Sequence, residues 1–168
     1  MTNSIKTFSN YFAILLLTSF LAACATAPTE TTSSTSTSQS QVVGGVYVGT
    51  ETIEMLAVDV PDRVFFAYDS YSLAASAQAT LNKQAKWLKA NPSVAIAVEG
   101  HADERGTREY NLALGDRRAS SVKDYLMSQG ISSNRISTIS YGKERPVKNG
   151  SNDTAWAQNR RSVSVRTN

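Results

Sequence analysis

Apolar positions recur with two different periods along residues 63–166, and these periods divide the stretch into strands and helices. Three runs rich in β-branched, aromatic and other apolar side chains predict strands: residues 63–68, 94–98 and 136–141. In residues 161–166, Val163 and Val165 alternate with polar positions, which indicates a last strand with one exposed face.

Two longer stretches show the three-to-four-residue spacing of a helix with one apolar face. The first helix is predicted over residues 73–89, with Ser72 as its N-cap and Pro92 just beyond its end. Its apolar stripe comprises Ala74, Ala77, Leu81, Ala85 and Leu88.

The second helix is predicted over residues 108–128, with Thr107 as its N-cap and Gly130 just past its end. Its core face comprises Leu112, Gly115, Ala119, Val122 and Leu126. Helical spacing puts Arg118 beside that face and Arg117 nearly opposite it. We therefore expect Arg118 to reach over the sheet edge and Arg117 to be solvated.

The predicted domain, residues 61–168, has the order strand, helix, strand, helix, strand, short helix, strand, with the short helix over residues 154–159. Two long helices and four strands pack most simply as helices on one face of a mixed four-stranded sheet, which is an α+β fold. The sequence contains no internal repeat, so one folded domain is expected.

The N-terminus carries Lys6 and then an apolar run over residues 11–21. This run is shorter than the roughly 20 residues of a membrane-spanning helix, and it fits the signal peptide of an exported protein, residues 1–23. The run closes with Leu-Ala-Ala-Cys, which resembles the bacterial lipobox and contains the only cysteine, Cys24. The resemblance implies that Cys24 is acylated and that Ala25 favours the outer membrane. The alternative is a chance cysteine after an ordinary signal peptide.

Residues 24–60 are predicted to form a flexible tether between the lipidated cysteine and the domain. Ser and Thr dominate residues 25–41, which contain no large apolar side chain, and Gly44 and Gly45 extend the flexibility. Such a coil reaches about 30–35 Å on average. Residues 53–60 are apolar enough to pack on the domain.

Net charge gives little support to a nucleic-acid partner. The formal charge of +3 includes Lys6, which leaves with the signal peptide, and the remaining basic residues are scattered along the chain. We therefore expect no nucleic-acid partner.

A cluster of ionisable side chains follows the strand that ends near residue 98, at the start of the second helix: His101, Asp103, Glu104 and Arg105. Open sheets with covering helices often bind ligands at such a point. Arg118 lies fifteen residues past Asp103, on the helix that follows this loop. An acid and a base therefore share one loop-helix unit, which suggests a zwitterionic ligand.

The same cluster offers little for catalysis or metal binding. His101 is the only histidine, and zinc sites use three or four side chains, so we expect no metal and no cofactor. No Gly-x-Ser-x-Gly motif is present, and we expect no enzyme activity. Two alternatives to a ligand-binding module remain. One is a cell-wall hydrolase, and the other is a module that mainly docks another protein.

Several motifs together resemble the OmpA-like peptidoglycan-binding domain family: residues 98–107, 109–111, 114–119, 140–144 and 159–161. The resemblance covers about residues 60–166. With the lipobox and the tether, it points to the peptidoglycan-associated lipoprotein branch of that family. The chain departs from the common pattern at Ala67 and Arg108.

The resemblance implies non-catalytic binding of meso-diaminopimelate in the peptidoglycan stem peptide. Asp103 would take the ammonium group of this residue and Arg118 its carboxylate. The other implied pocket residues are Asp69, Thr107, Asn111 and Leu114. The implied partners are peptidoglycan, TolB and other components of the Tol-Pal system of envelope integrity and cell division, and the implied location is the outer membrane, with the domain facing the periplasm.

Each of these residues also has a structural alternative. Asp103 could instead form an Asx turn or a helix cap, and Arg118 could pair with Asp116 or Glu99. The arginines at 160 and 161 either contact the glycan or orient the last strand. The two tryptophans, Trp87 and Trp156, are expected to be packing residues rather than sugar platforms.

Overall fold

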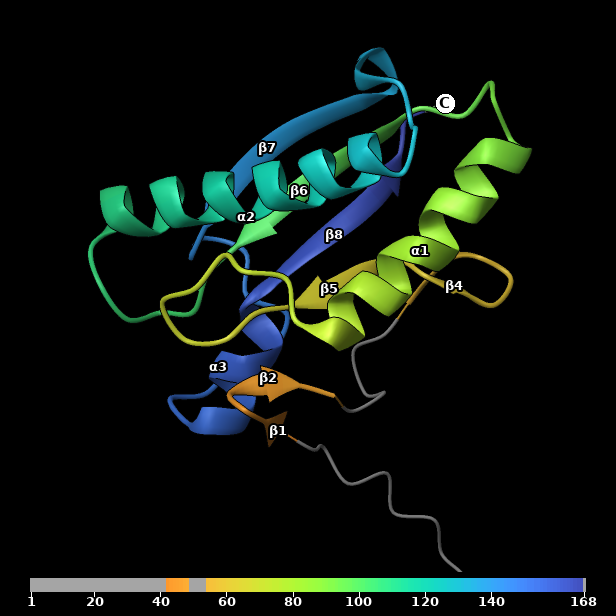
Figure 1. Ribbon diagram of the computed structural model, residues 1–168. Helices are drawn as coiled ribbons and strands as arrows, with labels where there is room; N and C mark the ends of the chain where they lie inside the picture. Colours follow the sequence, from red (N-terminus) through yellow and green to blue (C-terminus); the bar gives the residue numbers. More distant parts are fainter. Residues whose placement is uncertain (1–41, 49–53, 168) are drawn as a thin grey trace, which may run out of the picture. The chain divides into compact units, whose positions relative to one another are not determined.

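The computed structural model describes residues 42–48 and 54–167 (Figure 1). The predicted signal peptide, Cys24 and the tether up to residue 41 lie outside the described residues. Within the described part, the strands are β1 Val42–Val43, β2 Val46–Tyr47, β3 Met55–Ala57, β4 Val60–Pro61, β5 Arg63–Phe65, β6 Ile96–His101, β7 Ile136–Gly142 and β8 Arg161–Arg166. The helices are α1 Ala75–Ala90, α2 Arg108–Ser128, the 3₁₀ helix η1 Ser133–Arg135 and α3 Asp153–Asn159. No helix in these described ranges is long and apolar enough to span a bilayer.

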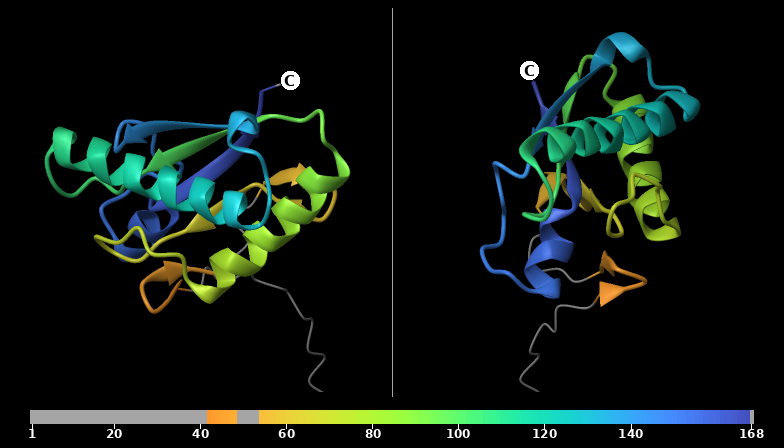
Figure 2. Two further views of the ribbon diagram at one scale, coloured as in Figure 1. Left: turned by 45° about the horizontal axis from the view of Figure 1, so that its top comes forward. Right: turned by 90° about the vertical axis from the view of Figure 1, so that its left-hand side faces the viewer.

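Four of the strands form one mixed sheet in the order β5-β8-β6-β7. Strand β6 runs parallel to β7, and β8 is antiparallel to both β6 and β5. Helices α1 and α2 lie on the same face of this sheet (Figures 1 and 2). The predicted α+β fold, with helices on one face of a mixed four-stranded sheet, is confirmed.

The main core fills the space between the two long helices and the sheet. Its buried side chains are Val64, Phe66, Ala77, Leu81, Ala85, Leu88, Ile96, Val98, Ala119, Val122, Leu126, Ile131 and Ile136. Alternation along β6 points Ile96 and Val98 to the helices, because successive side chains of a strand face opposite sides. This face of β6 ends at Gly100, directly before the polar loop.

Two expectations about the helices are wrong. Helix α1 has Ala74, not Ser72, as its N-cap, and no side chain caps it. The loop before α1 instead folds on itself, with the Ser72 N–H donating to Ser70 Oγ at 3.1 Å. Leu112 is 44% exposed rather than in the core, because its backbone and not its side chain faces β7, where Ser140 Oγ donates to the Leu112 carbonyl at 2.6 Å. The core position is taken by Leu114.

Residues 42–47 and 55–61 form two short hairpins where the sequence predicted a tether as far as residue 60. Strand β1 pairs with β2, and the intervening Gly44 and Gly45 have φ angles of 57° and 75°, as the tightest hairpin turns require. These glycines therefore make a turn instead of extending a flexible segment. Tyr47 is 2% exposed, and its ring meets that of Phe65 edge-on with centroids 4.8 Å apart.

The second hairpin, β3–β4, accounts for the apolar stretch expected to pack on the domain. Its Leu56 is 4% exposed. The Asp62 N–H, just after β4, donates to the Glu54 carbonyl at 3.0 Å. Folded structure therefore begins before residue 61.

Candidate ligand-binding site

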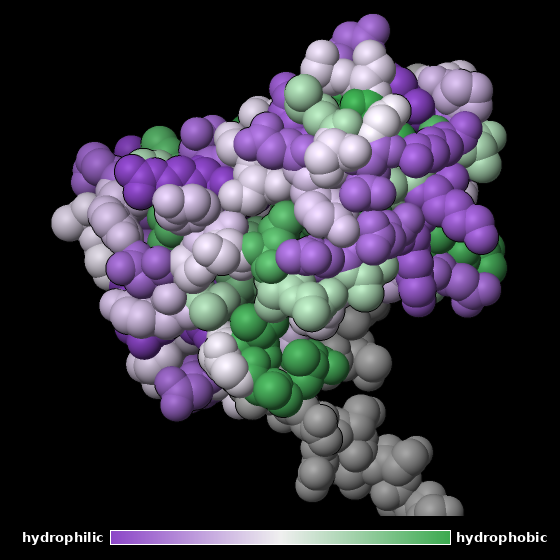
Figure 3. Space-filling model, viewed as in Figure 1, coloured by the Kyte–Doolittle hydropathy of each residue, from purple (hydrophilic) through white to green (hydrophobic). Residues whose placement is uncertain are grey.

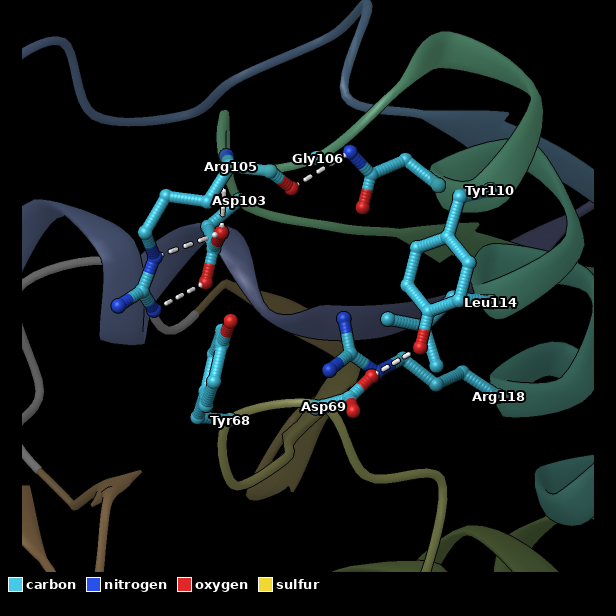
Figure 4. A pocket seen from close by; sticks show the side chains of 9 residues that line it. Tyr68, Asp69, Asp103, Arg105, Gly106, Tyr110, Leu114 and Arg118 are labelled. Atoms are coloured by element: carbon cyan, nitrogen blue, oxygen red, sulfur yellow. Dashed lines mark hydrogen bonds and ion pairs between the residues drawn. The ribbon is translucent and has the colours of Figure 1, made fainter.

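A cavity of ≈ 240 Å³ opens where the loop after β5, the loop after β6 and the first turns of α2 meet (Figure 4). Its lining residues are Tyr68, Asp69, Asp103, Arg105, Gly106, Tyr110, Asn111, Leu114 and Arg118. Of the six residues predicted for a pocket, only Thr107 is not in the lining. Its Oγ1 accepts the Tyr110 N–H at 3.2 Å, so Thr107 is the N-cap of α2, as predicted.

Asp103 lies in the loop after β6 with its carboxylate almost fully buried. Its Oδ1 accepts from the backbone N–H of Arg105 at 3.1 Å and from Arg105 Nε at 3.2 Å. Its Oδ2 accepts from Arg105 Nη2 at 2.7 Å and from Arg160 Nη1 at 3.2 Å. Burial alone would raise the pKa of this carboxyl, but the hydrogen bonds from Arg105 and Arg160 hold the pKa below its ordinary value. Asp103 thus makes the Asx-type turn and lines the cavity at the same time.

Arg105 was not among the predicted pocket residues. Its guanidinium carbon lies 4.1 Å from the ring centroid of Tyr68 and 4.1 Å from that of Trp156. The bond to Asp103 raises the pKa of Arg105 above its ordinary value. The residue stands in the recognised motif, but its two aromatic partners lie far away in the sequence, and no spacing rule brings them together.

Arg118 is completely buried beneath the cavity. Its Nε donates to the Ser70 carbonyl at 2.8 Å, its Nη1 to the His101 carbonyl at 2.7 Å and its Nη2 to the Ala67 carbonyl at 3.2 Å. Burial, and next the charge of Arg160, lower the pKa of Arg118 to about 10. Among the described residues, Arg118 forms no ion pair, so neither Asp116 nor Glu99 neutralises it.

Asp69 lines the same cavity as Arg118 (Figure 4). Its backbone is in the left-handed region, with a φ of 50°, and its carboxylate accepts a hydrogen bond from the Tyr110 hydroxyl. The cavity rim is aromatic, with Tyr68 61% and Tyr110 48% exposed. Acids and arginines therefore line the cavity together, under a rim of tyrosines.

The position of Arg118 depends on a very close approach of α2 to β6. A Cβ atom added to Gly100 would lie only 1.8 Å from the carbonyl oxygen of Gly115. Backbone therefore packs on backbone at this crossing, which any side chain would prevent. Arg118, one turn after Gly115, is thereby carried under the loops that end β5 and β6.

His101 lies outside this cavity and is 1% exposed. Its ring stacks on Tyr141 with centroids 5.5 Å apart, and its Nε2 lies 3.4 Å from a Glu99 carboxylate oxygen. Burial first, and then the charges of Arg161, Arg145 and Arg63, lower the pKa of His101 to about 3, so the attraction of Glu99 does not prevail. In the described part of the chain, no group of three or more His, Cys, Asp or Glu residues could hold a metal ion.

Arg160 joins the site to the first hairpin. Besides its bond to Asp103, it donates from Nη2 to the Gly45 carbonyl at 2.7 Å and from Nε to the Phe66 carbonyl at 3.1 Å. These contacts give Arg160 an internal role next to the start of β8.

The two departures from the family pattern have different surroundings. The Ala67 carbonyl accepts a hydrogen bond from Arg118, and Arg108 forms a surface ion pair with Glu144 at 3.4 Å.

The two tryptophans have different surroundings. Trp87 packs against the edge of the main core, as predicted. The Arg105 guanidinium lies over the ring of Trp156, and Trp156 Nε1 donates to the Glu104 carboxylate at 2.9 Å. Trp156 thus supports the site indirectly, by holding the loop that carries Asp103.

The sequence profile of the OmpA family matches residues 65–160. The chain belongs to the OmpA family. The family match covers β5 to α3, so it includes every residue of the cavity.

Known OmpA-family proteins include relatives named peptidoglycan-associated lipoprotein. That of Brucella melitensis is 59% identical over 108 residues, which are 64% of this chain and 64% of that protein. That of Rhizobium meliloti is 59% identical over 108 residues, 64% of this chain and 61% of that protein. The match therefore spans less than two thirds of the length of these relatives.

Solved structures of the OmpA family agree with the fold. The crystal structure of the peptidoglycan-associated lipoprotein from Burkholderia pseudomallei aligns with a TM-score of 0.62 and 43% identity, over 63% of this chain and 90% of that one. The C-terminal domain of Helicobacter pylori MotB aligns with a TM-score of 0.59 and 22% identity, over 64% of this chain and 84% of that one. The second likeness concerns the fold alone.

Proposed function

We propose that this protein is a lipid-anchored protein of the bacterial envelope that binds peptidoglycan without catalysis, through the meso-diaminopimelate residue of the stem peptide. The names of the relatives support association with peptidoglycan. One observation supports the choice of ligand group. Arg118 is a buried cation that touches three backbone carbonyls and no carboxylate of the described residues.

Arg118 suits a carboxylate for reasons of both charge and geometry. A guanidinium has five N–H groups, and three of those in Arg118 donate to the backbone. Two remain for a ligand carboxylate, which a guanidinium holds best at two points. Burial of a cation that no carboxylate contacts is costly, so a ligand carboxylate that contacts Arg118 offsets part of this cost.

The ligand ammonium belongs on the acidic side of the cavity. Asp103 is the predicted partner, but Arg105 and Arg160 already occupy both of its oxygen atoms. An ammonium that binds Asp103 must therefore displace part of the Arg105 contact. Asp69 is a second acceptor within the same cavity.

The decisive experiment compares two neighbouring arginines in co-sedimentation with purified sacculi. Arg118→Lys keeps the charge but loses the two-point grip, and we expect at least about tenfold weaker binding, which corresponds to about 1.4 kcal/mol. Arg117→Lys, on the exposed face of the same helix, is the matched control and should bind normally.

Thermal unfolding of both variants separates loss of binding from loss of fold. If folded Arg118→Lys and Asp103→Asn proteins both sediment with sacculi like the unchanged protein, the pocket assignment is wrong. Release of soluble fragments from sacculi by the pure protein would instead favour the hydrolase alternative.

A second candidate function, docking of TolB within the Tol-Pal system during cell division, has support from the cavity rim. At the rim, Tyr68 and Tyr110 are 61% and 48% exposed, and exposed tyrosines are typical of protein interfaces. A shared surface predicts that a soluble diaminopimelate-containing muropeptide competes with TolB. Independent binding of the two would exclude a shared surface.

The proposed location follows from the sequence rather than from the fold. The lipobox cysteine and Ala25 favour an acyl anchor in the outer membrane, with the domain facing the periplasm. Labelling with a radioactive fatty acid tests the anchor, and Cys24→Ser should remove the label.

A further inference from the structure

A second surface feature lies at the end of the domain away from the ligand cavity. It is a shallow hollow of ≈ 340 Å³ between the β3–β4 turn and the C-terminal half of α1, called here the Trp87 surface. Its residues are Val58, Asp59, Val60, Lys83, Lys86, Trp87 and Ala90. At the right-hand edge of Figure 3, a small apolar area over this turn is bordered by hydrophilic residues.

The apolar part of the Trp87 surface is presented to solvent rather than folded away. Val58 is 88% exposed at the tip of a tight turn, where Asp59 has a φ of 59°. Trp87 is half-buried beside it, because one side of its ring packs on the main core. An exposed valine on a rigid turn next to an indole suits contact with another apolar phase.

The polar part of this surface is cationic. Helix α1 carries Lys83, Lys86 and Lys89 and no acidic residue. The guanidinium of Arg166 lies 6.0 Å from the Trp87 ring centroid, which adds a further positive charge nearby. Against these cations stands one acid of the hollow, Asp59. The partner that complements this surface is anionic and has an apolar layer beneath its charges.

We propose that the Trp87 surface docks on an anionic phospholipid bilayer, the same membrane that holds the proposed acyl anchor. The proposal rests on the proposed anchoring at Cys24, because the surface is small and its affinity alone is low. Lys83 and Lys86 attract an anionic membrane, and Val58 and Trp87 add contact with the acyl region.

The chain itself supplies the local concentration that such a weak contact needs. Residues 24–41 link the anchor position to the first described strand, and a segment of that length spans at most about 65 Å even when fully extended. A linker this short gives effective concentrations on the order of millimolar. Docking that is undetectable for a free domain therefore becomes populated for the anchored one.

The placement of the Trp87 surface leaves the ligand cavity accessible during docking. The cavity is built at the start of α2, whereas the Trp87 surface is built at the C-terminal end of α1, and these two helix ends lie on opposite sides of the domain (Figures 1 and 2). A domain docked by Val58 and Trp87 turns the cavity away from the membrane.

The test places a polarity-sensitive dye on the acylated protein in vesicles. Because Cys24 is the only cysteine and is acylated, Val58→Cys provides a single labelling site. In vesicles of phosphatidylethanolamine and phosphatidylglycerol we expect a blue shift of the dye, reversed by about 0.5 M NaCl and absent in phosphatidylcholine. The same dye at Arg117→Cys should show none.

Charge reversal gives the second arm of the experiment. Lys83→Glu with Lys86→Glu should lower the ratio of docked to undocked protein at least roughly 30-fold, at about 1 kcal/mol per lysine. Arg117→Glu with Lys123→Glu on α2 is the matched control and should dock normally. Equal dye emission in the two vesicle types, or equal loss in both double variants, overturns the proposal.

Two further readouts keep this result apart from the proposed function. Flotation of the protein with vesicles reports anchoring, and co-sedimentation with sacculi reports wall binding. If the protein floats with vesicles and binds sacculi but the dye emission does not shift, the docking proposal is refuted and the proposed function is not.

Discussion

At the scale of single residues, the site is held by arginines that bond mainly to backbone carbonyls. Arg118 spans the loops after β5 and β6 through three such bonds, and Arg160 adds two more. Because carbonyls carry only partial charge, they fix the position of Arg118 without neutralising it. Helical spacing could place Arg118 near the sheet edge, but the carbonyls it meets depend on loop conformations that no spacing rule provides.

The buried His101 predicts how stability changes with pH. Its pKa falls from an ordinary 6.5 to about 3 on folding, so between these values the unfolded chain binds a proton that the folded chain does not. The free energy of unfolding should therefore fall as pH falls from about 6.5, by about 1.4 kcal/mol per pH unit. Denaturant unfolding at several pH values between about 6.5 and 4.5 measures this slope.

His101→Phe provides the control for that slope. It keeps a ring against Tyr141 and removes the only histidine of the chain. The variant should show a nearly flat profile over the same range. A profile unchanged by the substitution would contradict the assignment of the slope to His101.

At the scale of elements, the sequence predicted α2 to the residue and α1 less well. Thr107 supplies a side-chain cap and Gly130 takes up a φ of 87° after the helix, so both ends of α2 are fixed locally. The start of α1 has no capping side chain, and the loop before it is shaped by its bonds to Arg118. The wrong placement of Leu112 has a different cause, since the buried face of α2 at this turn includes the polar Asn111, which the periodicity of apolar residues does not mark.

The contact between α2 and β6 predicts a mutational effect larger than the change in volume suggests. Gly100→Ala puts a methyl group into the Gly115 carbonyl, so the helix must move away from the sheet. We expect about 1–3 kcal/mol of destabilisation and, because Arg118 moves with the helix, weaker binding to sacculi in the protein that remains folded.

Ala113→Leu adds more volume on the exposed side of α2 and serves as the comparison. It should leave both stability and sacculus binding nearly unchanged. Denaturant unfolding and co-sedimentation on the same samples measure both quantities. If Gly100→Ala equals Ala113→Leu in stability and in sacculus binding, α2 can shift without cost.

At the scale of the whole molecule, the fold could be predicted from periodicity, while the proposed function of the site came from family motifs. Asp103 and Arg118 stand in recognisable motifs and do line one cavity. Neither Arg105 between two aromatic rings nor the packing of the first hairpin on the domain could be inferred, because these contacts join residues far apart in sequence. The pair of glycines at 44 and 45 carries a local signal for a turn, which composition alone hides.

The hairpins predict that the domain boundary lies before residue 61. A chain shortened to begin at residue 61 lacks the ring contact of Tyr47 with Phe65 and the hydrogen bond from Arg160 to the Gly45 carbonyl. Burial of Tyr47 alone is worth about 1.5–3 kcal/mol, so this chain should unfold at clearly lower temperature than one that begins at residue 36. Equal melting temperatures would show that the hairpins contribute nothing.

The bond from Arg160 to the Gly45 carbonyl also decides how the domain responds to mechanical load. The chain enters the described domain at β1, so tension applied along its N-terminal segment reaches this hairpin first. One guanidinium then connects the loaded turn to the carboxylate of Asp103. In the proposed anchored protein, a pull between membrane and wall therefore reaches the loop of Asp103 through this one arginine.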